Sequence, residues 1–164
     1  MSVTDHPLRR PEEILALRPL KQILGALPKP VFSIAPADTV YDAVRIMKDK
    51  DVGFVVVLEG DELVGVLSER DCARSVTLAR RLADATPVAD VMVRDVITVD
   101  TNSNFADCLR LMHRHGIRHL PVVENRKVLA VLSVRDLMGE AVAHHTKIIA
   151  QLERERMTMF TSPV

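Results

Sequence analysis

The chain has 164 residues, of which 22 are basic and 22 acidic, so its formal net charge is zero. A neutral chain lacks the electrostatic attraction by which proteins bind nucleic acid or anionic membranes, and four Phe with one Tyr offer few base-stacking platforms. No apolar run approaches the roughly 20 residues of a membrane span. We therefore expect no nucleic-acid or membrane partner.

The first 30 residues predict an extension ahead of the folded core. Helical apolar spacing over 12–26 is interrupted at Pro19, and the sequence LPKP at 27–30 is typical of an extended linker. The opening sequence MSVTDHPLRRPEE lacks the apolar core of a signal peptide, so we expect a cytoplasmic protein. Cys72 and Cys108 lack metal-binding spacing and are expected to be small buried apolar residues.

A strand, a helix and two more strands are predicted in order from residue 31. The sequence VFSI at 31–34 predicts a short strand, and Val40, Val44 and Met47 recur at the spacing of one helix face. The runs FVVVL and LVGVL, joined by EGDE, predict strands buried on both faces. Ser68 then opens a second helix.

The segment between 75 and 95 connects this unit to the second half of the chain. Leu78 and Leu82, four residues apart, could continue the preceding helix. The sequence TPVADVM is typical of a short capped helix with Pro87 in its first turn.

The chain then repeats itself. A shift of 65 residues aligns 31–74 with 96–139 without a gap and gives 11 identical pairs among 44. In this second copy VITV at 96–99 predicts the first strand, and HLPVV and VLAVL predict the later two. Phe105, Leu109 and Met112 mark the buried face of the helix, which Gly116 is suited to end. Pro121 has no N–H to donate, so its strand should be at an edge or locally irregular.

These elements predict an α/β (α+β) fold of two β-α-β-β-α repeats. Each repeat of about 60 residues is marginal alone, so we expect the two to pack face to face about a pseudo-twofold axis. The expected divisions are an extension at 1–30, the repeats at 31–90 and 91–142, and a C-terminal helix and tail at 143–164. That helix should pack on the pair or on a second subunit through Leu137, Val142, Ile148, Ile149 and Leu152.

Two matching stretches, GVLSERD at 65–71 and AVLSVRD at 130–136, run from a strand into Ser-x-x-Asp. This pattern resembles a capping box, which is a sufficient structural explanation. The same geometry also suits binding, because helix-start N–H groups point outward and a carboxylate can accept hydrogen bonds from a ribose diol. Arg118 and His119 could hold phosphates, whereas the matching Gly53 and Phe54 carry no charge. The two sites should therefore be chemically unequal.

The duplicated order, ending each time in G-h-h-[ST]-x-x-D with h apolar, resembles a tandem pair of cystathionine-β-synthase (CBS) domains over about 31–140. SERDCAR and RHLPVV further resemble bacterial CBS-pair proteins associated with signal transduction. The resemblance implies a regulatory homodimer that binds AMP, ADP, ATP, NAD or S-adenosylmethionine in clefts between the repeats. Two departures are Ala130 in place of the motif Gly and Cys72 where many relatives have Tyr.

The same resemblance implies roles for individual residues. The motif Asp holds the ribose hydroxyls, the Ser assists, the strand residues line the base, and the basic residues meet phosphates. In the first copy the implied ligand-binding residues are Ser33, Ile34, Gly53, Phe54, Val55, Ser68, Arg70 and Asp71. In the second copy they are Thr98, Val99, Arg118, His119, Leu120, Pro121, Ser133, Arg135 and Asp136.

Other functions are weighed against this sensor. One is a structural dimerisation or partner-docking module with vestigial nucleotide sites, and no downstream target can be named from the sequence. An enzyme is not expected, because no P-loop, G-x-G-x-x-G or G-x-S-x-G motif occurs. Metal binding is not expected either, since adjacent His144 and His145 face different directions on a helix.

Overall fold

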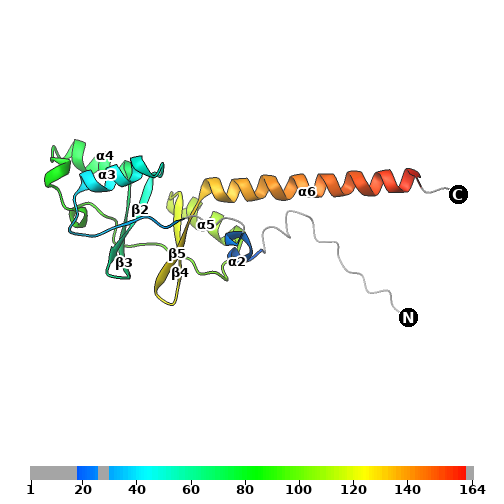
Figure 1. Ribbon diagram of the computed structural model, residues 1–164, viewed down its shortest axis with the longest axis horizontal. Coiled ribbons are helices and arrows are strands. Elements are labelled where there is room, and N and C mark those ends of the chain that lie inside the picture. The colour runs from blue at the N-terminus through cyan, green and yellow to red at the C-terminus, as the bar shows by residue number, and fades with distance from the viewer. Residues whose placement is uncertain (1–17, 26–29, 162–164) are drawn as a thin grey trace. The chain divides into compact units, whose positions relative to one another are not determined.

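The computed structural model describes residues 18–25 and 30–161 and divides them into two compact units (Figure 1). The sheet unit contains 30–101 and 119–132, and the helical unit contains 18–25, 102–118 and 133–161. The predictions made for 12–17 and for most of the LPKP linker lie outside the described residues.

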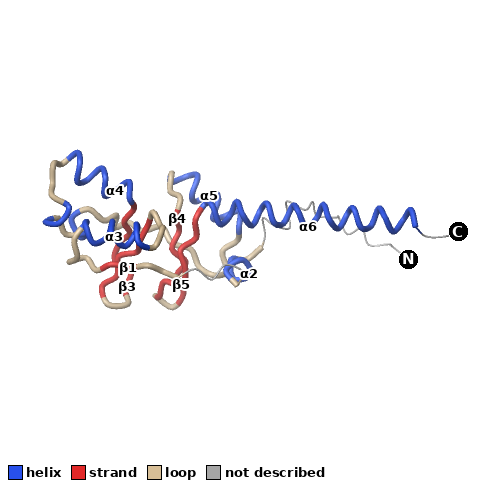
Figure 2. Tube along the Cα trace, turned by 45° about the horizontal axis from the view of Figure 1, so that its top comes forward, coloured by secondary structure: helices blue, strands red, loops and turns tan. Residues whose placement is uncertain are grey.

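The sheet unit holds the strands of both repeats (Figure 2). In the first repeat, β1 (Ser33–Ile34) pairs in parallel with β2 (Phe54–Glu59), and β2 pairs antiparallel with β3 (Glu62–Ser68). In the second repeat, β4 (His119–Glu124) and β5 (Lys127–Ser133) form a two-stranded sheet. The predicted order of elements is thus confirmed for the hairpins of both repeats.

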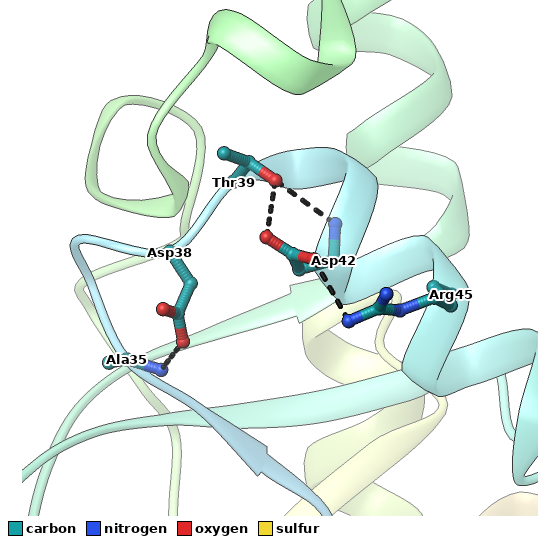
Figure 3. A network of polar contacts seen from close by, with 5 residues as sticks. All are labelled: Ala35, Asp38, Thr39, Asp42 and Arg45. Carbon is teal, nitrogen blue, oxygen red and sulfur yellow. Dashed lines mark hydrogen bonds and ion pairs between the residues drawn. The ribbon is translucent and has the colours of Figure 1, made fainter.

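The helix α3 (Val40–Asp49) connects β1 to β2 and begins at a well-defined cap (Figure 3). Thr39 Oγ1 accepts a hydrogen bond from the N–H of Asp42 and donates one to the Asp42 carboxylate, which also pairs with Arg45 at 3.1 Å. The bond from Thr39 is the main cause that lowers the pKa of Asp42 below its ordinary 3.8. The carboxylate is therefore charged at neutral pH, as a helix N-terminus favours.

The core of the sheet unit lies between α3 and the strands. Val55, Val56 and Val57 of β2 are all fully buried, which confirms a strand covered on both faces. On α3 the buried side chains are Val40, Ala43 and Met47. The prediction that Val44 belongs to this face is wrong, since Val44 is 41% exposed. Ala43 takes that place because positions i, i+3 and i+7 face the sheet.

The hairpins of the two repeats contact each other symmetrically at their tips. Glu62 pairs with Arg126 at 3.1 Å, and Asp61 pairs with Lys127 at 3.4 Å. The 65-residue shift takes Glu62 to Lys127 and Asp61 to Arg126. The two ion pairs are therefore exchanged by the shift, as a twofold relation requires. These exposed ion pairs add little stability, but they confirm the predicted pseudo-twofold relation between the hairpins.

The strand predicted at 96–99 is reduced to one parallel bridge between Val99 and Val122, so that prediction is wrong in extent. In the first repeat the N–H of Val56 donates to Phe32 O at 3.1 Å and extends the ladder. Pro121 stands at the equivalent position and has no N–H, so the second ladder cannot extend in the same direction.

The connector between the repeats also departs from expectation. Helix α4 (Glu69–Ala73) runs into a π-helical turn, η1 (Arg74–Leu78), and the chain then turns at Arg80 with a φ of 53°. Leu82 therefore lies outside the helix, contrary to prediction. The predicted short helix after Pro87 is a 3-10 turn, η3 (Val88–Asp90), which comes after another, η2 (Ala83–Ala85).

The helical unit comprises α2 (Leu20–Leu24), α5 (Phe105–His115) and α6 (Val134–Thr161). As predicted, Gly116 ends α5 in the left-handed conformation, with a φ of 62°. Leu20 N–H donates to Ser103 O at 2.9 Å, which joins α2 to the start of α5. Helix α6 is continuous through residue 143. None of the described helices combines the length and the apolar character needed to cross a membrane.

Candidate functional site

The first candidate site is the junction of β3 and α4 in the sheet unit. Ser68 Oγ accepts a hydrogen bond from the Asp71 N–H at 3.2 Å, and Asp71 Oδ2 accepts from both the N–H and the hydroxyl of Ser68. This is the predicted capping box, formed in full. Only Oδ2 is used, since Asp71 Oδ1 accepts no hydrogen bond from any described residue.

The second candidate site is the junction of β5 and α6, where the same arrangement recurs in the helical unit. Asp136 Oδ2 accepts from the N–H and the hydroxyl of Ser133 at 2.9 and 2.6 Å, and Ser133 Oγ accepts from the Asp136 N–H. Asp136 is 9% exposed, whereas Asp71 is half-buried. The structural interpretation of Ser-x-x-Asp is therefore confirmed in both repeats.

In each repeat the helix start is bonded to the residue that precedes a strand. The Glu69 N–H donates to Gly53 O at 3.1 Å, and the Val134 N–H donates to Arg118 O at 3.0 Å. These two bonds are equivalent under the 65-residue shift. They bring Gly53 beside the Asp71 box and Arg118 beside the Asp136 box, as the sequence grouped them.

Charged residues predicted near the sites are accessible. Arg70, Arg118 and Arg135 are exposed and form no ion pair with any part of the chain that the structure describes. An exposed guanidinium without an internal partner remains available to an anionic ligand. Arg118 is the member of this set whose backbone is bonded to a helix start.

Several predicted base-lining residues lie in the core instead of at an accessible surface. The side chains of Val55 and Leu120 are fully buried, and Ile34 and Val99 are 5% and 7% exposed. Ser33 and Thr98, one position earlier, are exposed, and Pro121 is buried. In this structure, then, Ser33 and Thr98 are the accessible residues of the two first-strand segments.

One contact among the predicted residues was missed by sequence reasoning. The rings of Phe54 and His119 stack with centroids 4.7 Å apart and planes inclined by 18°. Both residues were grouped with base-lining positions, each in its own repeat. Because they are equivalent under the shift, a twofold relation between the hairpins could have indicated that they meet.

Cys72 follows Asp71 directly, and its side chain is 3% exposed. Burial is the largest cause that raises the pKa of the Cys72 thiol from its ordinary 9.0 to about 11, and the Asp71 charge adds to it. The prediction that both cysteines are buried is confirmed, and neither forms a disulfide. The thiolate, which is the reactive form, is therefore scarce at neutral pH.

We expect the Cys72 thiol to resist iodoacetamide at pH 8 in the folded protein and to react in urea. The pKa of the Cys72 thiol is higher in the folded chain than in the unfolded chain. The protonated thiol therefore contributes folding stability that is present below pH 9 and is lost as the pH rises toward 11. Peptide mass spectrometry after timed labelling measures this, with labelling in urea as the control. Rapid labelling of the folded chain at pH 8 would contradict the assigned burial.

Among the described residues, no three His, Cys, Asp or Glu side chains gather as metal ligands would. His144 and His145 meet edge to face with ring centroids 6.1 Å apart.

The tandem repeats, each with a Ser-Asp capping box at a helix start, define a duplicated fold. The CBS domain family model matches residues 23–77 and 88–143, and the chain belongs to this family. It therefore carries a CBS domain pair, a regulatory module.

Relatives of known sequence or structure agree with this assignment. The chain is 33% identical over 107 residues to the CBS domain-containing protein YhcV of Bacillus subtilis, covering 65% of this chain and 76% of that protein. It is 32% identical over 120 residues to the mitochondrial CBSX3 protein of Arabidopsis thaliana, covering 70% of this chain but only 58% of that relative. A solved structure of a proposed signal-transduction protein with CBS domains from Burkholderia ambifaria MC40-6 matches with a TM-score of 0.74 and 35% identity, covering 77% of this chain and 95% of that one.

Proposed function

We propose that the protein is a non-catalytic sensor that binds adenosine-containing ligands, such as AMP, ADP, ATP or NAD, at its two Ser-Asp helix starts. In the first site Asp71 would accept hydrogen bonds from the ribose hydroxyls, and Ser68 would assist. Asp136 and Ser133 would do the same in the second site. The remaining residues that the sequence grouped around each box would contact the base and phosphates.

The observation that carries the proposal is the geometry of Asp71. Its Oδ2 is committed to the capping box, while Oδ1 accepts no hydrogen bond from the described residues. A charged oxygen held in place by a helix start can accept hydrogen bonds from a ligand without breaking the cap. The box therefore orients the carboxylate, and its second oxygen is the binding group.

The second site would be better suited to phosphate. Arg118 lies at the position that Gly53 occupies in the first repeat, and its guanidinium is exposed without an ion pair to any described residue. A guanidinium can bind a phosphate through two parallel hydrogen bonds. Ligands with phosphate groups should accordingly favour the Asp136 site over the Asp71 site.

A protein with the same fold supports the ligand class. The CBS domain pair of MJ0100, 19% identical with a TM-score of 0.68, was solved in complex with 5′-methylthioadenosine and S-adenosyl-L-methionine. We extend to this chain only the ligand class, adenosine-containing compounds. The particular ligand depends on the groups around each site, and these differ, with Arg118 beside Asp136 and Gly53 beside Asp71. Binding would act by changing the arrangement of a homodimer in the cytoplasm.

A ligand panel by thermal shift tests the proposal. AMP, ADP, ATP, NAD and S-adenosylmethionine should be compared with guanosine and inorganic phosphate controls at equal concentration. A ligand that binds only the folded state at 100 times its Kd stabilises it by about 2.7 kcal/mol, which raises the melting temperature. No shift with any adenosine compound at millimolar concentration would favour the alternative, a docking module with vestigial sites.

A further inference from the structure

The long helix α6 carries an apolar surface that the described residues leave uncovered. Met138, Val142, Ile149 and Leu152 are between 54% and 63% exposed. Together with His145, which is also exposed, they define the α6 seam. Their spacings of four, three, four and three residues are those of the a and d positions of a heptad repeat. Leu137, by contrast, is fully buried, so α6 packs on its own chain along a different face.

We propose that the α6 seam pairs with the α6 seam of a second copy, as a parallel two-stranded coiled coil. This inference specifies the surface for the proposed homodimer and does not depend on nucleotide binding. Helix α6 continues past the segment that contacts α5 and Arg18 in the helical unit (Figure 1). A heptad seam is complementary to itself, which suits the isologous interface of a dimer.

The area available is near what a dimer needs. Each of the four apolar side chains exposes on the order of 100 Å², which gives about 800 Å² for two helices. His145, Ile148 and the flanking positions would add to this total, and specific interfaces begin near about 1,000 Å². The opposite face of the helix is charged, with Glu140, Lys147 and Arg154 seven residues apart. Between residues 138 and 152, the large apolar side chains that are more than half exposed thus lie on one side of the helix, as in a pairing helix.

Charge favours the parallel arrangement. In the heptad register, Val142 and Ile149 are a positions, and Arg156 is the next one. Arg156 forms no ion pair with any described residue. In a parallel pair the preceding g position of the other helix, Glu155, lies beside it and offers a carboxylate. In an antiparallel pair Arg156 would instead face the region of Met138, where the adjacent seam flanks are Gly139 and Ala141.

Sedimentation equilibrium of the full chain and of three variants tests the pairing. Ile149→Glu would place an unpaired charge in the seam and should weaken self-association at least about 30-fold. His145→Leu replaces a polar d residue and should strengthen self-association about tenfold. Lys147→Glu, on the opposite face, is the matched control and should change it less than about twofold. Circular dichroism checks that each variant retains its helices.

Oxidative cross-linking identifies what covers the seam. Leu152→Cys should form disulfide-linked dimers, because equivalent d positions approach each other in a parallel pair, and Lys147→Cys should not. The native thiols of Cys72 and Cys108 are buried and give little background. The proposal is wrong if the chain is still monomeric at 100 times the protein concentration used for cross-linking. It is also wrong if Ile149→Glu leaves self-association unchanged, or if Leu152→Cys and Lys147→Cys cross-link equally. A dimer that survives Ile149→Glu would place the contact on the CBS repeats and leave the ligand proposal intact.

Discussion

Replacing Asp71 and Asp136 together by Ala is expected to weaken the binding of adenosine ligands strongly at both sites. Each carboxylate would no longer accept the ribose hydrogen bonds, which costs about 1.5–3 kcal/mol for bonds to a charged group. That loss corresponds to about a 10- to 150-fold weaker affinity at each site. Calorimetric titration of AMP and NAD into the wild-type chain, the single variants and the double variant measures it.

The serines of the two boxes provide the matched control. Ser68→Ala and Ser133→Ala remove the hydroxyl that caps the helix and leave the carboxylate in place, at a cost of about 1 kcal/mol of folding stability. Their affinity should fall much less than that of the Asp variants. Because the serines would only assist the ligand, equal losses of affinity in the Ser and Asp variants would contradict the leading role assigned to the carboxylates.

The two single variants should also differ from each other. If Arg118 binds phosphate beside the Asp136 box, Asp136→Ala should weaken ATP binding more than Asp71→Ala does, because phosphate ligands favour that site. Adenosine itself, which lacks phosphates, should show a smaller difference between the two variants. Equal losses for both ligands would contradict the chemical inequality of the sites.

The helix starts were predictable from the sequence because their chemistry is local. Ser68 and Asp71 are three residues apart, and the bonds that join them need no other part of the fold. The repeat made the prediction stronger, since the same bonds had to form at Ser133 and Asp136. The left-handed turn at Gly116 is local in the same sense.

Features that depend on contacts distant in the sequence were predicted less well. The spacing of apolar residues assigned Val44 to the core, but that assignment depends on where the sheet lies relative to α3. The short strand predicted at 96–99 is reduced to the bridge between Val99 and Val122 because Pro121, 22 positions past the end of that segment, has no N–H to extend the ladder. The sequence showed that Pro121 cannot donate a hydrogen bond. It did not show which residue of the neighbouring strand lies opposite Pro121, because that depends on the strand register.

The stacking of Phe54 on His119 shows a third limit. Each residue was correctly placed at the start of a strand beside a helix start, and the pseudo-twofold relation was expected. The sequence does not say how far the axis lies from either strand, so it cannot distinguish a ring contact from two separate rings. Only the packing of the hairpins, fixed in part by the Glu62–Arg126 and Asp61–Lys127 pairs, decides this.

Leu67→Ala is expected to lower the free energy of unfolding by about 2–5 kcal/mol, the range for truncating a buried leucine. Leu67 is fully buried on β3, directly opposite Val55 on β2, and belongs to the core cluster that includes Met47 and Cys72. Truncation would leave a cavity between the sheet and α3 that these neighbours can fill only in part. Urea unfolding followed by circular dichroism measures the change.

Leu132 is the equivalent residue of the second repeat, and its 1% exposure predicts a loss of similar size for Leu132→Ala. Both leucines lie in the sheet unit, so each variant should shift one cooperative transition of that unit. Leu129→Ala, on the same strand as Leu132 but 47% exposed, is the control and should cost less than about 1 kcal/mol. If only Leu67→Ala destabilised the chain, the second hairpin would not share the core of the first. The two repeats would then be similar in sequence but would not unfold as one cooperative unit.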